Sequence, residues 1–217
     1  MNLYSYFRSS AAYRVRIALA LKGLSSEIIP VNLVENEQKA ESYRSRNPQG
    51  LVPALELDDG TILGQSMAIL EWLEETHPEP ALYPMEPLAK AAYRAHCLHI
   101  ACDIHPLNNL RVLRYLGDTL ELDQQAVGDW YSHWIQTGFN AIEKAASEFT
   151  GDFSLGDKPG MFEVMLVPQL YNARRFSVAI DNYPAIIALD ERCASMRDFH
   201  NAHPGRQIDT PDEERLD

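Results

Sequence analysis

Hydrophobic and polar positions follow two different patterns along the chain, and the pattern changes near residue 77. Before that point, short apolar runs bounded by turn residues indicate strands, and they alternate with segments of helical spacing. The strand-like runs are 2–7, 26–33, 51–57 and 61–64, and the helix-like segments are 11–21, 37–45 and 66–77. The order is therefore β-α-β-α-β-β-α, which predicts an α/β domain.

Four prolines between residues 77 and 87 predict a stiff, non-helical connector. The segments after it have helical spacing: 88–116 with a break at Pro106, then 123–148, 161–178 and 184–200. We therefore place a domain boundary at the connector and predict an α/β domain in 1–80 and an all-α domain in 88–217. The polar, proline-containing tail at 203–217 is expected to fray or lie loosely.

Composition limits the classes of partner. Of 217 residues, 46% are hydrophobic, and 31 acidic residues against 19 Lys and Arg give a formal charge of −12. Such a chain repels phosphate backbones, so we expect no nucleic-acid partner. It has no apolar run long enough to span a bilayer, so we expect no membrane partner. The first residues indicate a strand rather than a signal sequence, and Cys97, Cys102 and Cys193 are too few for a disulfide framework, so we expect a cytoplasmic protein.

The stretch Arg8-Ser9-Ser10 lies between a predicted strand and a predicted helix, although one hydroxyl is enough to cap a helix. The helix dipole favours negative charge at this end by about 0.3–1 kcal/mol, and a hydroxyl can donate a hydrogen bond to a thiolate. Because one pKa unit corresponds to about 1.36 kcal/mol, the dipole and a hydroxyl together could lower the pKa of a thiol by about one or two units. The serines lack a recognisable base partner, so a Ser-His-Asp nucleophile is poorly supported.

Two further features of the first domain suit a ligand with peptide and carboxylate groups. In LVPALEL, a cis Val52-Pro53 bond would leave the Val52 backbone able to pair with an extended peptide ligand; a trans proline at a strand start is the alternative. Gln65-Ser66 begins a helix whose free N–H groups suit a carboxylate, and the Gln65 amide could help to hold an α-amino-acid head group. The alternative is that Ser66 is a plain N-cap.

Taken together, the element order, the Val-Pro strand start, the Gln-Ser helix start, the proline-rich linker and the helical second half resemble the glutathione S-transferase superfamily. The resemblance is closest to the zeta class, whose first-helix motif is Ser-Ser-Cys-x-x-Arg-Val-Arg. The residues that match this motif are Ser9, Ser10, Arg14, Val15 and Arg16. Ala11 stands where the motif has Cys.

The resemblance implies a thioredoxin-like α/β domain followed by an all-α domain, glutathione as the cofactor, and a homodimer. It implies that Ser9 faces the glutathione sulfur with Ser10 beside it, and these two are the candidate catalytic residues. The further candidate glutathione contacts are Gln38, Val52, Pro53, Gln65, Ser66, His105, Asn108 and Asn109.

The implied activity is the cis–trans isomerisation of a maleyl group, most simply maleylacetoacetate to fumarylacetoacetate in the breakdown of tyrosine and phenylalanine. Maleylpyruvate is the alternative substrate, and a glutathione-conjugating transferase and a non-catalytic glutathione-binding module are further alternatives. Both maleyl substrates carry carboxylate and oxo groups, which suit the planar fork of arginine. The candidate substrate-binding residues are Arg8, Arg111 and Arg175, with surface or interdomain ion pairs as the alternative for each.

Other arginines are expected to have structural roles. Arg174 should point about 100° away from Arg175 on a helix, outward or into a salt bridge. We expect Arg14 and Arg16 to serve the helix surface and domain packing.

Three local sequence features limit the chemistry further. Ala11 removes a protein thiol, but in the family's scheme the reacting sulfur belongs to glutathione, so isomerisation is not excluded. In GDKPGMFEV, Gly160 and Glu163 replace the family's usual capping Thr and Asp, which predicts a weaker helix cap. The run HCLHIACDIH has the composition of a zinc site, but its side chains would scatter around a helix, so we expect no metal.

Overall fold

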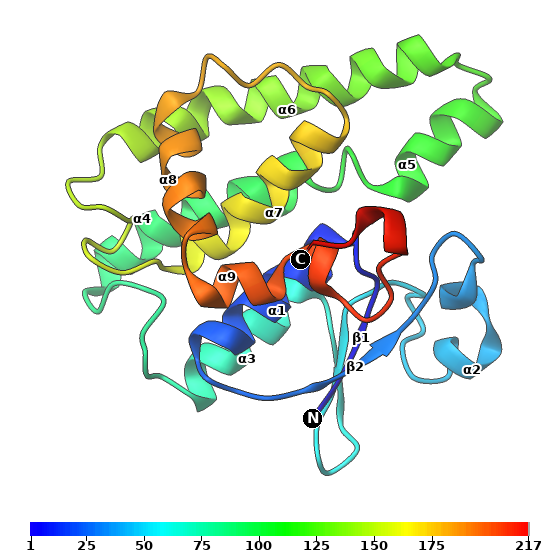
Figure 1. Cartoon of the computed structure of the whole chain (residues 1–217), viewed down its shortest axis with the longest axis horizontal. Helices are drawn as coiled ribbons and strands as arrows, with labels where there is room; N and C mark the ends of the chain where they lie inside the picture. The colour runs from blue at the N-terminus through cyan, green and yellow to red at the C-terminus, as the bar shows by residue number, and fades with distance from the viewer. Residues whose placement is uncertain (217) are drawn as a thin grey trace. The chain divides into compact units, whose positions relative to one another are not determined.

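The computed structural model describes residues 1–216, which form two compact units (Figure 1). One unit contains Met1–Ala81 together with the segment from Ala194 onwards, and the other contains Leu82–Cys193. The predicted domain limits of 1–80 and 88–217 remain a prediction. In the structure, the residues from Ala194 onwards pack with the first unit, whereas the prediction assigned them to the helical domain.

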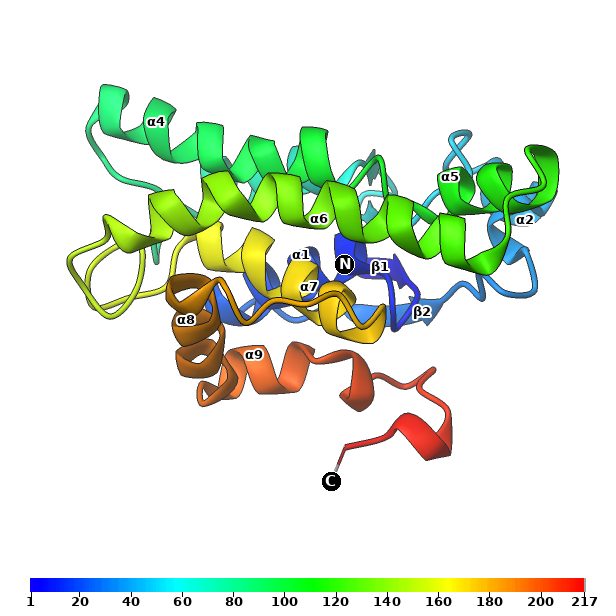
Figure 2. The same ribbon diagram turned by 90° about the horizontal axis from the view of Figure 1, so that it is seen from above.

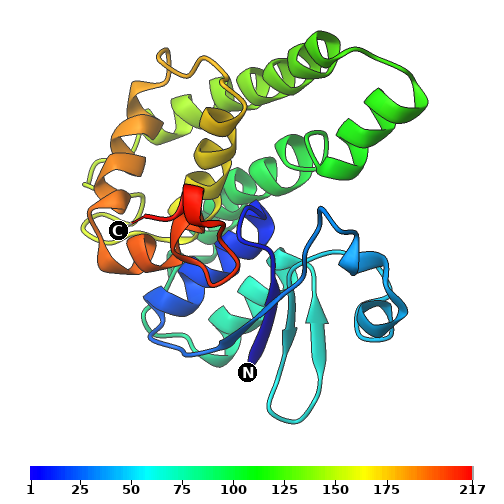
Figure 3. The same cartoon turned by 45° about the vertical axis from the view of Figure 1, so that its right-hand side comes forward.

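The first unit is built on a four-stranded sheet in the order β2-β1-β3-β4. In chain order, its elements up to residue 81 are β1 (Asn2–Ser5), α1 (Ser10–Leu21), β2 (Glu27–Pro30), the 3-10 helix η1 (Glu37–Lys39), α2 (Glu41–Arg44), β3 (Ala54–Glu56), β4 (Ile62–Gly64) and α3 (Ser66–Thr76). β1 is parallel to β2 and antiparallel to β3, and β3 is antiparallel to β4; this hairpin is coloured cyan in Figure 3. The predicted β-α-β-α-β-β-α order is confirmed, and with it the thioredoxin-like α/β fold.

The strands are held in register by their apolar positions and by the predicted turn. Leu3 on β1 lies opposite Leu55 on β3, and both side chains are fully buried. Between β3 and β4, Gly60 takes a φ of +85°, and Asp59 accepts a hydrogen bond from Thr61 N at 2.9 Å. Because side chains alternate along a strand, this register fixes which residues of the sheet face the core.

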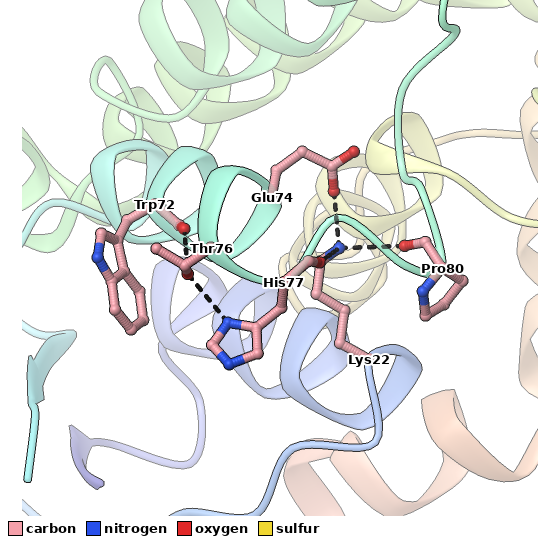
Figure 4. Close-up of polar contacts among 6 residues, drawn as sticks. All are labelled: Lys22, Trp72, Glu74, Thr76, His77 and Pro80. Atoms are coloured by element: carbon pink, nitrogen blue, oxygen red, sulfur yellow. Dashed lines mark hydrogen bonds and ion pairs between the residues drawn. The ribbon is translucent and has the colours of Figure 1, made fainter.

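The end of α3 is fixed by a buried lysine at the end of α1. Lys22 donates from Nζ to His77 O at 2.7 Å and to Pro80 O at 3.0 Å, and its ion pair with Glu74 is 2.8 Å long (Figure 4). Its side chain is fully buried, so these groups replace water around the ammonium. Lys22 therefore anchors the point at which the chain leaves α3.

The C-terminal tail does not lie loosely, so that expectation was wrong. It contains the 3-10 helices η4 (Pro204–Arg206) and η5 (Asp212–Glu214), and it follows α9 (Arg197–Ala202), which packs on α1. Thr210 is buried and donates to Pro204 O, and Leu216 N donates to Gly205 O at 2.9 Å. The tail's polar residues bond to its own backbone, which lets a polar segment pack.

The second unit is helical. Its elements are α4 (Pro87–Leu98), the π-helical segment η2 (His99–Ile104), α5 (Leu110–Arg114), the π-helical segment η3 (Tyr115–Thr119), α6 (Gln124–Ser147), α7 (Met161–Arg175) and α8 (Pro184–Ala194). Figure 2 shows α6 as one long continuous helix. Its start at the Asp123 cap agrees with the prediction, since Asp123 accepts from Ala126 N at 2.8 Å. The all-α character predicted for this part of the chain is confirmed.

The break predicted at Pro106 in the segment 88–116 is confirmed by a turn over 105–108, and η2 also interrupts the regular α-helix just before it. The helix predicted over 184–200 is two helices, because α8 ends at Ala194 and α9 starts at Arg197 after Met196, whose ψ of 134° is extended. That break directs the chain back to the first unit.

Buried polar groups at the start of α7 form a set of connected hydrogen bonds. Glu163 is fully buried and accepts from Gly160 N at 2.8 Å and from Ser154 N at 2.7 Å, so the predicted reach back to the cap position is confirmed. Gly160 has no side chain to accept from the first turn. The hydroxyl of Tyr93, on α4, does so instead and accepts from Phe162 N at 3.0 Å.

Candidate functional site

The ends of three neighbouring strands place the first unit's candidate residues along one edge of the sheet. Tyr4, Ala54 and Gly64 lie side by side in the register of β1, β3 and β4. The chain leaves β1 toward Ser9, enters β3 from the Val52-Pro53 peptide, and leaves β4 toward Gln65. The fold therefore gathers three motifs that are far apart in the sequence.

Ser9 is the N-cap of α1. Its φ of −68° and ψ of 111° are extended, and its Oγ accepts from Ala12 N at 3.2 Å. A hydroxyl that accepts this bond still has its own proton to donate. Ser10 is the first helical residue and is buried, whereas Ser9 and Ala11 are partly exposed. Of the two serines, Ser9 is therefore the one whose hydroxyl can meet a ligand at the helix start.

Arg8 forms an ion pair with Glu214 in the C-terminal segment. Its Nε donates to Glu214 Oε2 at 3.0 Å, and its terminal nitrogen donates to the other carboxylate oxygen. The Arg8 guanidinium also lies 5.0 Å from the centroid of the Phe7 ring. The structure thus places Arg8 in the ion-pair alternative, and its role toward a substrate stays a prediction.

Two arginines of α1 support this edge from inside. Arg14 is 1% exposed, and its guanidinium lies 3.4 Å from Ser66 Oγ, so it links α1 to the first turn of α3. Arg16 donates to Ser5 Oγ, Phe7 O and Ala202 O at 3.0–3.1 Å. The packing role expected for both arginines is confirmed, whereas their expected place on the helix surface was wrong, because both side chains are buried. Arg14 adds a positive charge beside Ser66.

The peptide bond between Val52 and Pro53 is cis, as one of the two alternatives predicted. The turn before it is anchored at Leu51 O, which accepts from Tyr43 Oη at 2.6 Å and from Asn47 Nδ2 at 2.8 Å. Burial raises the pKa of Tyr43 to about 12, so its hydroxyl remains a donor. Val52 precedes the β3 ladder, which begins at Ala54.

Gln65 and Ser66 do not form a plain cap, so that alternative was wrong. Gln65 is the cap residue of α3, with a φ of +66° and a ψ of 119°, and its side chain makes no capping bond. Non-glycine residues rarely take this conformation, and those that do concentrate at ligand sites. The Gln65 amide instead donates to Gln49 Oε1 at 2.8 Å. Gln49 was not predicted; its signal is the turn sequence Asn47-Pro48-Gln49-Gly50.

Gln38 lies on η1 beside that turn. It is 8% exposed, and among residues 1–216 its Oε1 has no hydrogen-bond partner. Gly50 approaches it closely, because a Cβ at Gly50 would lie 3.0 Å from Gln38 O. Buried polar atoms are almost always paired, so this oxygen suits a donor from a ligand.

The candidate residues of the second unit surround the turn after η2. Asn108 donates to Tyr131 O at 3.2 Å, and its buried Oδ1 has no partner within the described chain. Asn109 caps α5 by accepting from Arg111 N at 3.1 Å. His105 is partly exposed in the same turn. Asn108 and Asn109 thus have structural roles, and contact with glutathione stays a prediction for these three residues.

Arg111 and Arg175 are both exposed, so neither side chain would have to leave a buried position to contact a ligand. The Arg175 guanidinium lies 4.7 Å from the centroid of the Phe176 ring, which stacks on Tyr131 at 3.9 Å. The neighbouring Arg174 points elsewhere and forms a 2.5 Å ion pair with Asp190, as the helical geometry predicts. Of the two arginines at the end of α7, Arg174 therefore stabilises the fold through its ion pair, and Arg175 faces the solvent.

Comparison with known proteins identifies the family. Residues 8–76 match the model of the glutathione S-transferase N-terminal domain. Maleylacetoacetate isomerase of Pseudomonas aeruginosa is 46% identical over 97% of this chain and 99% of its own length. No helix within residues 1–216 is long and apolar enough to cross a membrane.

Two solved structures agree with that assignment. A holo maleylpyruvate isomerase, described as a bacterial zeta-class glutathione S-transferase, has a TM-score of 0.94 and 41% identity, covering 97% of this chain and 100% of its own. A maleylacetoacetate isomerase from Anaeromyxobacter dehalogenans with glutathione in its active site has a TM-score of 0.87 and 46% identity, covering 97% of both chains. The fold, the motifs at the sheet edge and these full-length similarities show that the chain belongs to the glutathione S-transferase family.

Proposed function

We propose that this protein is a glutathione-dependent isomerase that converts maleylacetoacetate to fumarylacetoacetate. The observation that carries the proposal is the 46% identity, over nearly the whole length of both chains, to a maleylacetoacetate isomerase. A related isomerase binds glutathione in its active site. Here the ligand-binding groups would be the buried Gln38 oxygen, which has no hydrogen-bond partner among residues 1–216, and the strained Gln65. In the cell we expect a cytoplasmic homodimer acting in tyrosine and phenylalanine breakdown.

The sheet edge supplies groups for each part of glutathione. The Val52 backbone, before the β3 ladder, would pair with the cysteinyl peptide. Gln65 and the N-terminus of α3 would hold the γ-glutamyl carboxylate, with Arg14 behind Ser66 adding positive charge. The buried Gln38 oxygen would accept a donor near the glycine end.

Ser9 has the geometry to hold a thiolate. Its oxygen accepts a hydrogen bond from Ala12 N, and its hydroxyl proton can be donated to a bound thiolate. The α1 dipole adds a favourable positive potential. When bound, glutathione supplies a thiolate that adds reversibly to the cis double bond, so that rotation about a single bond precedes return of the double bond as trans. Ser10, buried behind Ser9, would fix the helix start rather than donate directly.

The substrate's charges require cationic partners. Arg8, Arg111 and Arg175 remain the candidates, because an arginine fork binds a carboxylate in a bidentate manner and stabilises negative charge that develops during addition. Arg111 and Arg175 are exposed, whereas Arg8 would engage a substrate from its ion pair with Glu214.

Maleylpyruvate isomerase is the second candidate, because a maleylpyruvate isomerase has the same fold at a TM-score of 0.94. The deciding experiment compares kcat/KM for maleylacetoacetate and maleylpyruvate at catalytic glutathione concentration. A higher value for maleylacetoacetate supports the proposal, and a higher value for maleylpyruvate replaces it with the alternative. Stoichiometric loss of glutathione would instead indicate a conjugating transferase, and binding without turnover would indicate a non-catalytic module.

Ser9→Ala tests the assigned catalytic role within the same assay. Loss of the hydroxyl should lower kcat while the protein still binds glutathione, since the Val52, Gln65 and Ser66 contacts remain. Unchanged turnover would exclude Ser9 as the thiolate donor.

A further inference from the structure

The turn between β1 and α1 is held from outside by residues far away in the sequence. Phe7 N donates to Asp209 Oδ2 at 2.9 Å, across a separation of 202 positions. Arg8 pairs with Glu214 across 206 positions. Both partners belong to the polar C-terminal segment that the sequence pattern gave no reason to assign to a site.

The peptide groups before and after Phe7 are both restrained. On one side Asp209 accepts the Phe7 N–H, and on the other Phe7 O accepts from Arg16 at 3.1 Å. Arg16 in turn donates from Nε to Ala202 O at 3.0 Å, at the end of α9. The turn that leads into Ser9 is thus held between α1 and the C-terminal segment.

The segment is itself rigid enough to serve as a support. Gln207 donates from its amide to Asn201 O and His203 O at 3.1 and 2.9 Å. Arg215 Nε donates to Thr210 O at 3.0 Å, so the backbone on either side of Asp209 is fixed. A carboxylate placed on such a support restrains the group that donates to it.

We propose that Asp209 and Glu214 are positioning residues of the isomerase reaction, which hold the Phe7-Arg8 turn so that Ser9 and Arg8 meet the thiolate and the substrate in the productive geometry. Asp209 acts through the Phe7 N–H on Ser9, and Glu214 acts directly on the Arg8 guanidinium. This inference rests on the proposed function. Neither residue touches the reacting atoms.

The test compares Asp209→Ala with Asp209→Asn, because the asparagine retains an oxygen that can accept the Phe7 N–H. Asp212→Ala is the matched control: it removes an equal charge from the same segment at a carboxylate that is 96% exposed. The readouts are kcat and KM for isomerisation and the ultraviolet absorbance of the thiolate of bound glutathione as a function of pH. Circular dichroism of each variant confirms that it is folded.

In Asp209→Ala we expect the pKa of bound glutathione to rise by about one unit, which is a tenfold loss of thiolate below that pKa. The kcat should fall by a similar factor. Asp209→Asn should recover most of both, and Asp212→Ala should match the unaltered protein. In Glu214→Gln we expect KM for the maleyl substrate to change about threefold or more, with the thiolate absorbance unchanged, since Glu214 acts on Arg8 rather than on Ser9.

Three results would overturn the inference. A folded Asp209→Ala variant with unaltered thiolate absorbance and kcat would show that the Phe7 contact does not position Ser9. Equal losses in Asp209→Ala and Asp209→Asn would assign the effect to charge rather than to the hydrogen bond. An unaltered protein that binds no glutathione would overturn the proposed function and this inference together, whereas normal turnover with insensitive variants would overturn the inference alone.

Discussion

Tyr93→Phe removes one oxygen atom, and the structure predicts a large effect on stability. That oxygen accepts from Phe162 N at 3.0 Å in the first turn of α7, where Gly160 offers no capping side chain. The hydroxyl also bonds to Ser154 Oγ, which donates to the buried carboxylate of Glu163. These groups therefore form a chain of hydrogen bonds in which the Phe162 N–H donates to Tyr93, Tyr93 donates to Ser154, and Ser154 donates to Glu163.

The magnitude follows from the group that is left unpaired. Phe162 is fully buried, and an unsatisfied buried donor costs about 1–3 kcal/mol, a range that includes the loss of an ordinary N-cap. We expect the free energy of unfolding to fall by about 2 kcal/mol. For a chain of this size that lowers Tm by about 4–8 °C. The measurement is urea-induced unfolding followed by circular dichroism, with Tm from calorimetry.

Tyr115→Phe is the control, because it removes the same oxygen atom from a side chain that is 56% exposed. A second variant tests the capping role itself. A Cβ at Gly160 would collide with the Tyr93 hydroxyl and with Leu155, so Gly160→Ser should destabilise the unaltered protein, and it should cost less in Tyr93→Phe, where the collision with the hydroxyl is gone. The reasoning is refuted if Tyr93→Phe unfolds like Tyr115→Phe, or if the two substitutions at the cap are simply additive.

Three further predictions concern the first unit. Lys22→Met leaves two carbonyls and Glu74 without their buried cation and should cost about 3 kcal/mol in urea unfolding, whereas exposed Lys144→Met should change little. Burial, followed by the charge of Arg16, lowers the pKa of His203 to about 4, and its Nδ1 accepts from Gly205 N. The free energy of unfolding should therefore fall as the pH drops from about 6.5 through 4, because the unfolded state binds the proton first. His203→Asn should flatten this pH dependence, and a profile parallel to that of the unaltered protein would contradict the assignment. Gln65→Gly relieves the backbone strain at a φ of +66° and should raise the free energy of unfolding by about 1 kcal/mol. The same substitution should weaken glutathione binding measured by calorimetry, and unchanged binding would remove Gln65 from the site.

Local sequence rules were sufficient for the first unit's strands but left the Val52-Pro53 bond open between cis and trans. Alternating apolar residues and the Asp59-Gly60 turn are short-range signals with one economical structural solution each, whereas the Val-Pro pair had two, of which the structure has the cis form. The sheet register then follows, because a shift by one residue would turn Leu3 and Leu55 out of the core. The ligand roles of the residues at the sheet edge were implied by the resemblance to the glutathione S-transferase superfamily, not by this register.

Contacts over 200 positions could not be predicted in the same way. Asp209 and Glu214 lie in a polar, proline-containing stretch, whose composition is shared by tails that do fray. Their partners are a backbone N–H and an arginine, and neither partner has a local signal that selects one distant carboxylate over the others. Tyr93 is similar, because the missing side chain at Gly160 is visible in the sequence but its replacement on another helix is not.

Ala11 gives the site its chemical character. The sequence has only three cysteines, and Cys97, Cys102 and Cys193 all belong to the second unit, whereas Ser9 and Ala11 belong to the first. Two of the three are buried, and burial raises the pKa of the Cys193 thiol far above its usual range, which leaves it unreactive. The first unit contains no cysteine, so we expect the thiolate at the start of α1 to be that of a bound ligand. A helix start with a hydroxyl, a favourable dipole and no sulfur of its own is suited to borrow a thiolate and return it, which is what a cofactor regenerated in each cycle requires.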